Sequence, residues 1–215
     1  MVRGWRGGGA VWGLIGAIVA AHLVLMLQPA WRGPAEFYFG VIPQRFAPAG
    51  TEGFANPLEA LGPLFGAVFL HGGLLHLGMN MLVLVQVGPL VDHRLGALRF
   101  LLLFFGCAAV AALAYVAINA GSPVPAIGAS GAVCGVFSAY LLAVRADWRE
   151  ALRERRILLA GFWFLAVNVG LAFVAARSGV LPIAWEAHLG GFVGGLMLYP
   201  VLSGFGGTGR ARKIA

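Results

Sequence analysis

The sequence predicts an all-α membrane protein, and three observations support this fold class. Of its 215 residues, 60% are hydrophobic and only 11% are charged, and the mean hydropathy is +0.87; soluble domains carry about 25% charged residues. Apolar runs of roughly 20 residues, the length that a helix needs to cross a bilayer core, recur along the chain. Basic residues lie between these runs rather than on one amphipathic face, which favours a membrane protein over a nucleic-acid-binding protein.

Six apolar runs are candidate transmembrane helices of a single membrane domain, residues 1–215. The predicted spans are residues 10–28, 61–90, 100–119, 129–144, 157–176 and 182–202. The second run is longer than a bilayer requires, so we expect one of its ends to lie outside the core. The fourth is short, which suits a helix that begins below the membrane surface. Residues 29–60 form the predicted outer loop, and residues 203–215 form a basic tail.

The positions of the basic residues predict the orientation. With the N-terminus inside, twelve of the 15 lysines and arginines lie in inner segments, and only Arg32, Arg45 and Arg177 lie in outer ones. This bias predicts that both termini are cytoplasmic. The second, fourth and sixth spans then all run inward from the outer face. Polar residues early in these three spans should therefore lie in one layer below the outer surface.

A serine and a histidine occupy corresponding places in two of these spans. Ser130 lies about two residues into the fourth span, and His188 lies about six residues into the sixth. A serine hydroxyl is a weak nucleophile until a base removes its proton, and histidine suits that role. No Asp or Glu lies in the core of a span, and Glu186 is about 200° from His188 around a helix. The pattern therefore predicts a Ser-His dyad rather than a triad.

Glycines beside both residues predict close helix packing. Gly131 and Gly135 follow Ser130, while Gly191 and Gly195 follow His188 at positions i+3 and i+7. Such pairs of small residues allow two transmembrane helices to pack with their backbones in contact. A hydrogen bond of about 3 Å between the dyad residues requires this close approach.

The second predicted span supplies candidate oxyanion donors. His76 and Asn80 are four residues apart and so share one helix face, and the backbone N–H of Ser130 is a third candidate because it lies near a helix N-terminus. Each such donor is worth roughly 3–4 kcal/mol in catalysis. His71 is about 140° from His76 around a helix, which suits a residue that holds a loop. Each residue also has a non-catalytic interpretation as a contact between helices, and we assign His22 a structural or interfacial role.

Together these elements resemble the rhomboid family of intramembrane serine proteases. The resemblance rests on Gly128-Ala129-Ser130-Gly131, on Ala187-His188 with Gly191 and Gly195, and on His71 followed by His76 and Asn80, in the family's order and spacing. It covers the whole six-span chain. It implies a compact bundle of six helices with a water-filled cavity that opens outwards.

The resemblance also implies roles for single residues. Ser130 looks like the nucleophile and His188 like the general base. His76, Asn80 and the Ser130 amide look like the oxyanion hole, and His71 looks like a structural histidine. Gly128 would form part of the tight loop before the nucleophile.

Two departures from the family pattern affect the surroundings of the site. Many members carry a Trp-Arg pair in the first outer loop; here Trp31-Arg32 lies too close to the first span to count as that motif. Some members carry a tyrosine four residues after the nucleophile, stacked on the histidine. Cys134 takes that position in this chain, so the support of His188 must differ.

The implied partners are transmembrane protein substrates, which would enter sideways past the fifth span, and the lipid bilayer. No cofactor, metal or nucleic acid is implied, and the oligomeric state stays open. The layout resembles that of proteins in a bacterial inner membrane, with the active site opening to the outer side. Two alternatives are a family member that binds membrane proteins without cleaving them, and a small transporter that uses its buried histidines. A transporter would predict acidic residues within the spans or inverted repeats.

Overall fold

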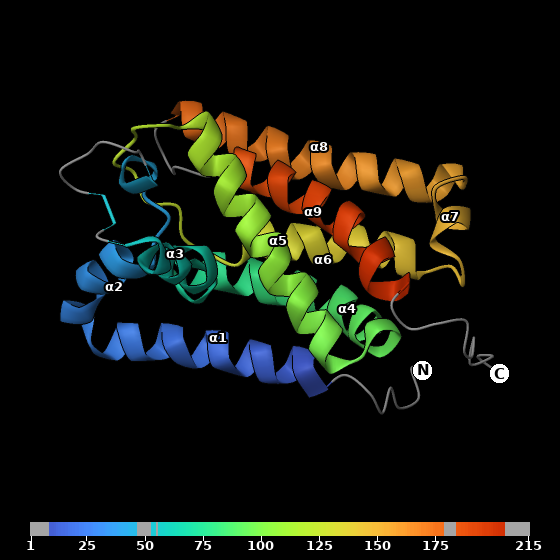
Figure 1. The fold of residues 1–215 in the computed structure, drawn as a ribbon, viewed down its shortest axis with the longest axis horizontal. Coiled ribbons are helices and arrows are strands. Elements are labelled where there is room, and N and C mark those ends of the chain that lie inside the picture. The colour runs from blue at the N-terminus through green and yellow to red at the C-terminus, as the bar shows by residue number, and fades with distance from the viewer. Residues whose placement is uncertain (1–8, 47–52, 55, 179–183, 205–215) are drawn as a thin grey trace.

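The computed structural model describes residues 9–46, 53, 54, 56–178 and 184–204, and within these residues it contains helices and no β-strand. This confirms the predicted all-α fold class. The α-helices in chain order are α1 (Gly9–Leu27), α2 (Arg32–Phe39), α3 (Leu61–Gly66), α4 (Leu74–Leu95), α5 (Ala97–Ile118), α6 (Ser130–Ala143), α7 (Trp148–Ala151), α8 (Arg155–Ser178) and α9 (Trp185–Gly204). The six long helices alternate in direction, so α1 begins at the same end of the molecule at which α9 ends (Figure 1).

The helices differ in their capacity to cross a membrane. By length and composition, α1, α4 and α5 could each span a bilayer. Helix α6 is apolar but has only 14 residues, about 21 Å of helix against a hydrocarbon core of about 30 Å. Eleven of those 14 residues are buried. We therefore expect the N-terminus of α6 to lie below the level at which its longer neighbours end.

The predicted second span, residues 61–90, differs from the observed helices. Its first part forms the short helix α3 and the 3₁₀ helix Ala67–Phe69, and the membrane-length helix α4 begins only at Leu74. The chain between them passes through Gly72 and Gly73, and the latter has an extended backbone. Helix α4 then runs on to Leu95 and ends at Gly96, whose positive φ of +80° is one that glycine adopts readily and other residues rarely do. Hydropathy alone does not reveal this break, because both parts are apolar.

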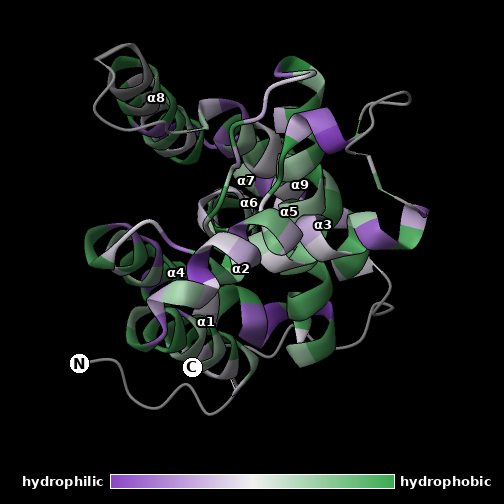
Figure 2. Ribbon diagram, turned by 90° about the vertical axis from the view of Figure 1, so that its left-hand side faces the viewer, coloured by the Kyte–Doolittle hydropathy of each residue, from purple (hydrophilic) through white to green (hydrophobic). Residues whose placement is uncertain are grey.

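Helix α6 lies at the centre of the bundle, among α4, α5 and α9 (Figure 1). Large apolar side chains fill the space around it, and Leu84, Phe100 and Phe104 have no exposed surface. Figure 2 shows α8 at the edge of the bundle, with hydrophobic residues along its length. Several of its large apolar side chains, including Phe162 and Trp163, are exposed, as expected of a helix that faces lipid.

Helix α1 is attached to α4 at the end where α1 begins. The buried carboxylate of Asp92 accepts a hydrogen bond of 3.1 Å from the backbone N–H of Val11. This bond satisfies one of the amides that the first turn of a helix leaves without a partner. Nearby, a Cβ on Gly88 would lie 2.6 Å from a methyl group of Val11, so a side chain there would separate the two helices.

Residues 32–46, called the outer segment here because they belong to the predicted outer loop, pack against the loop that leads to α6. Val41 and Ala126 exchange two backbone hydrogen bonds of 2.9 Å, and the N–H of Gln44 donates to the carbonyl of Ser122 at 3.0 Å. The guanidinium of Arg45 is buried between the rings of Phe37 and Phe54, each 4.5 Å away, and donates to the Phe37 carbonyl. This cation holds the outer segment together from within.

Candidate active site

The structure brings Ser130 and His188 into contact. Ser130 is the first residue of α6, and His188 is the fourth residue of α9. The Oγ of Ser130 lies 2.9 Å from Nε2 of His188, which is hydrogen-bonding distance for a nucleophile and its base. His188 is buried and Ser130 is half-buried. The two residues lie 58 positions apart in the sequence, so the packing of α6 against α9 creates this pair.

The two glycine pairs lie where these helices touch. A Cβ on Gly191 would overlap the carbonyl oxygen of Gly131, and a Cβ on Gly195 would overlap that of Gly135. In the reverse direction, a Cβ on Gly135 would lie 2.7 Å from the carbonyl oxygen of Gly191. The backbones of α6 and α9 are therefore in direct contact over two turns. This contact sets the distance between Ser130 and His188.

Ser138 joins the same two helices by hydrogen bonds. Its hydroxyl has no exposed surface and lies 2.7 Å from the carbonyl oxygen of Phe192 in α9 and 3.0 Å from that of Gly135 in its own helix. From the sequence, Ser138 is interpreted only as a packing or interfacial residue. Its position about two turns after Ser130, on a helix whose glycines predict close packing, was the signal that could have identified this contact.

The loop that precedes Ser130 is held from two sides. The N–H of Gly128 donates to the carbonyl of Ala67 at 2.9 Å, and the N–H of Ala129 donates to Nε2 of His71 at 3.4 Å. Gly128 has a φ of +117°, a conformation that glycine adopts readily and other residues rarely do. His71 thus binds the backbone directly before the serine.

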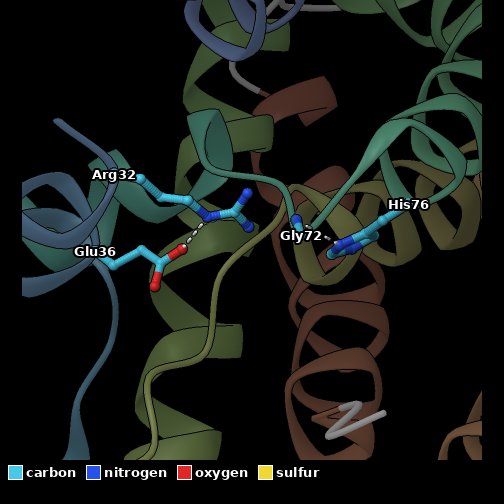
Figure 3. A network of polar contacts seen from close by, with 4 residues as sticks. All are labelled: Arg32, Glu36, Gly72 and His76. Carbon is cyan, nitrogen blue, oxygen red and sulfur yellow. Dashed lines mark hydrogen bonds and ion pairs between the residues drawn. The ribbon is translucent and has the colours of Figure 1, made fainter. Parts of the chain in front are cut away.

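His76 lies against the same loop. A Cβ on Gly128 would lie 2.7 Å from Cε1 and 2.8 Å from Nε2 of His76, so only a glycine leaves room for this ring. Nδ1 of His76 accepts a hydrogen bond of 3.4 Å from the N–H of Gly72, as Figure 3 shows. Because Nδ1 accepts, the proton of the neutral ring resides on Nε2. His76 therefore presents a donor beside the loop that carries Ser130.

Asn80 lies one turn further along α4 and is buried. Its side-chain amide donates to the backbone carbonyl of His76 at 2.9 Å. This bond uses one of its two N–H groups and leaves the other for a further acceptor.

The comparisons with known proteins agree with this architecture. A family model described as "Rhomboid domain" matches residues 59–205. The chain belongs to the rhomboid family. The matched range runs from the start of α3 to the end of α9 and contains each of the predicted site residues. Because the domain is a rhomboid domain and α1, α4 and α5 are apolar enough to cross a bilayer, this rhomboid chain is an integral membrane protein.

Individual rhomboid relatives match over about two thirds of this chain. RHOMBOID-like protein 4 of Arabidopsis thaliana is 34% identical over 144 residues, which cover 65% of this chain and 33% of that protein. Rhomboid protease GluP of Bacillus subtilis is 31% identical over 145 residues, which cover 65% of this chain and 26% of that protein. The putative rhomboid protease YdcA of Bacillus subtilis is 29% identical over 135 residues, or 63% of this chain and 64% of that protein. The first two relatives are thus much longer than the region that they share with this chain.

The surroundings of His188 in this rhomboid chain are apolar. Within the part of the chain that the structure describes, its Nδ1 is buried and has no hydrogen-bond partner. Cys134 is buried in a cluster with Leu141 and Phe192. About one turn further along α6, the ring of Phe137 stacks on the ring of Phe164 in α8, and the two ring centroids are 3.6 Å apart. Cys134 therefore lies in an apolar cluster among α6, α8 and α9.

Two further residues of this rhomboid fold were not identified from the sequence. Arg45 organises the outer segment, and Asp92 caps α1. Asp92 accepts from a backbone group 81 positions away, and Arg45 donates to a carbonyl eight positions away, so helical periodicity gives no signal for either. Among the described residues, no group of three or more His, Cys, Asp or Glu side chains is arranged to hold a metal ion.

Proposed function

We propose that the protein is an intramembrane serine endopeptidase in which Ser130 is the nucleophile and His188 is the general base. The observation that carries this proposal is the 2.9 Å contact between Ser130 Oγ and His188 Nε2. In that geometry Nε2 can accept the hydroxyl proton as Oγ attacks a peptide carbonyl carbon. The family relationship and the names of the bacterial relatives support the same class of reaction.

The reaction then proceeds in two halves. Attack by Ser130 Oγ gives a tetrahedral intermediate, and the proton held on His188 passes to the amide nitrogen as the C–N bond breaks. This leaves an acyl-enzyme ester on Ser130 and a free amine product. A water molecule gives its proton to His188 and attacks the ester carbonyl, and the proton returns to Ser130 Oγ as the acid product leaves.

The developing oxyanion would be stabilised by three donors. They are Nε2 of His76, a side-chain N–H of Asn80 and the backbone N–H of Ser130. The last of these is in the first turn of α6, where amides have no partner within the helix. Fixed donors in a site of low dielectric constant stabilise the transition state more strongly than water does.

The substrates that fit this site are transmembrane segments. Ser130 lies at the start of a helix too short to cross the bilayer, so the peptide bond must reach it from within the membrane. A helical substrate has to unwind there, because its own hydrogen bonds shield the scissile bond. Entry past α8 fits the position of that helix at the edge of the bundle (Figure 2). The distribution of basic residues favours cytoplasmic termini and a site that opens outwards, in a membrane such as the bacterial inner membrane.

A serine-reactive fluorophosphonate tests the proposal without knowledge of the substrate. We expect the purified protein in detergent to be labelled, and Ser130→Ala to lose all labelling. Ser203→Ala serves as a matched control, because this α9 serine bonds only to its own helix, at Pro200. Labelling that survives in Ser130→Ala would contradict the proposal. If a small sulfonyl fluoride and the fluorophosphonate both fail to label the folded protein, the chain is instead a member that binds without cleaving.

Asn80→Ala is expected to lower the rate of cleavage of a transmembrane substrate by roughly 10²–10³-fold and to leave measurable activity, because one oxyanion donor of three is lost. Asn119→Ala is the matched control. The Asn119 amide makes the same type of bond, to the carbonyl of Tyr115 at 3.1 Å, at the end of α5. Single-turnover cleavage should be unchanged in Asn119→Ala. Equal losses in both variants would assign Asn80 to helix stability rather than to the oxyanion.

A further inference from the structure

Two connected hollows lie beside the end of α1 that leads into α2. One is a small cavity of about 10 Å³, with room for about one water molecule, and His22, Arg32, Glu36 and His71 are in its lining. The other is a groove of about 620 Å³, open on one side, which is lined by apolar residues of α1, α2, α3 and α5. Leu25 and Leu70 line both. The two hollows therefore adjoin, one polar and the other apolar.

The polar cavity has groups that can hold an anion. The side-chain carboxylate of Glu36 accepts a hydrogen bond from Nε of Arg32, at 2.9 Å. Figure 3 shows the two terminal amino groups of Arg32 pointing away from Glu36, toward the loop that carries Gly72. Nε2 of His22 and Nδ1 of His71 are buried without a hydrogen-bond partner, and both side chains have only 3% of their surface exposed. Buried ring nitrogens normally have a partner, so the cavity fits one oxygen atom, such as that of a water molecule, while a larger anion would lie at its rim, on Arg32.

The apolar groove extends away from this cavity toward the middle of α1. Its wall includes Ala21, six residues before the end of α1 and so about 9 Å deeper than Leu27. The rings of Phe65 and Phe105, 6.2 Å apart, lie further along the same wall. Helix α2, which supplies Arg32 and Glu36 to the polar cavity, exposes Tyr38, a residue type that favours the membrane interface. The polar cavity therefore lies at headgroup level, and the groove lies at acyl-chain level.

We propose that one glycerophospholipid binds at this place, with its phosphate on Arg32 and one acyl chain in the groove. An arginine fork matches a phosphate group in geometry and charge. The acyl chain is in apolar surroundings both in the groove and in the bilayer, so the groove adds little selectivity and the polar contact selects the lipid. The free nitrogens of His22 and His71 receive water or headgroup oxygens. The site is separate from the dyad and does not depend on the proposed reaction.

The test measures lipid binding to the purified, delipidated protein in detergent by native mass spectrometry. The probes are palmitoyl-oleoyl phosphatidylglycerol and a diacylglycerol with the same chains but no phosphate. We expect one phosphatidylglycerol to bind with at least tenfold higher affinity than the diacylglycerol. Arg32→Gln should remove this preference, whereas Glu36→Gln should keep or increase it. Arg149→Gln is the control, because Arg149 is likewise paired with a carboxylate, that of Asp147 at 3.7 Å, but lies far along the chain in α7.

A second pair of variants tests the groove. Ala21→Trp fills it and should abolish binding of both probes, while Ala20→Trp, at the exposed neighbouring position, should leave it unchanged. The Ser130→Ala variant should bind lipid as the unmodified protein does, which separates this proposal from the proposed protease activity. Equal affinity for the two probes, or equal effects of Ala21→Trp and Ala20→Trp, would overturn the assignment. A dimer that Ala21→Trp dissociates would assign the groove to a second copy of the chain.

Discussion

Replacement of His188 by alanine is expected to lower the cleavage rate of a transmembrane substrate by about 10⁴-fold or more, because Ser130 then has no base to remove its proton. Ser130→Ala should cause a loss of similar size. The double variant should be no worse than either single variant, since two residues that act as one unit lose their effect together. Cleavage of a fluorescent transmembrane peptide in proteoliposomes measures all three.

His93→Ala is the control for the loss of a histidine side chain. His93 lies in the last turn of α4, and the proposed mechanism gives it no role. It should keep cleavage within about twofold of the unmodified protein, as substitutions remote from the dyad usually do. Retention of full activity in His188→Ala, with the bundle folded by circular dichroism, would exclude the Ser-His mechanism. Additive losses in the double variant would show that the two residues act separately.

Gly191→Ala is expected to be the most damaging small substitution in the bundle. The new methyl group would overlap the carbonyl oxygen of Gly131, and backbone atoms cannot move aside as a flexible side chain can. Overpacking in a core typically costs about 1–3 kcal/mol, and we expect the upper end of that range or more. Separation of α6 from α9 should also remove fluorophosphonate labelling. Thermal unfolding in detergent, followed by circular dichroism, measures the change in stability.

Gly13→Ala is the matched control for this substitution. Gly13 is also within a helix, but a Cβ there would meet no atom within 4 Å, so alanine should stabilise α1 by about 0.5–1 kcal/mol. A rescue is available at Gly131, where an added Cβ would lie 2.5 Å from that of Ala111. Gly131→Ala should therefore be destabilising, and Ala111→Gly should restore part of the loss. A harmless Gly191→Ala would contradict the backbone contact between the helices.

The sequence was sufficient to predict the helical bundle and which residues would meet at its centre. Hydropathy located the long helices because lipid-facing and core-facing side chains are both apolar in a membrane protein. The glycine spacing after Ser130 and His188 indicated the contact of α6 with α9, because only small residues allow that approach. The catalytic roles of these residues stay predictions until activity is measured.

Other features depend on contacts that no local pattern encodes. The apolar run of residues 61–90 contains a break before Leu74, where His71 binds the N–H of Ala129, 58 positions away. The Asp92 carboxylate meets Val11, 81 positions away. Arg45 donates to the carbonyl of Phe37 and lies between two aromatic rings, partners that a charge pattern does not indicate. The pairings of His71 and Asp92 arise only once the helices have packed.

The backbone contact between α6 and α9 limits how such a protein can diversify. With no side chains between the two helices, the separation of Ser130 and His188 cannot be adjusted by gradual changes in residue size. The smallest possible change at any of the four glycines is a whole methyl group, and at Gly191 that group has no space. Variation that alters substrate choice must therefore accumulate in other places, such as the outer segment and α8. Protein engineers could accordingly redesign these peripheral parts while keeping α6 and α9 as one unchanged unit.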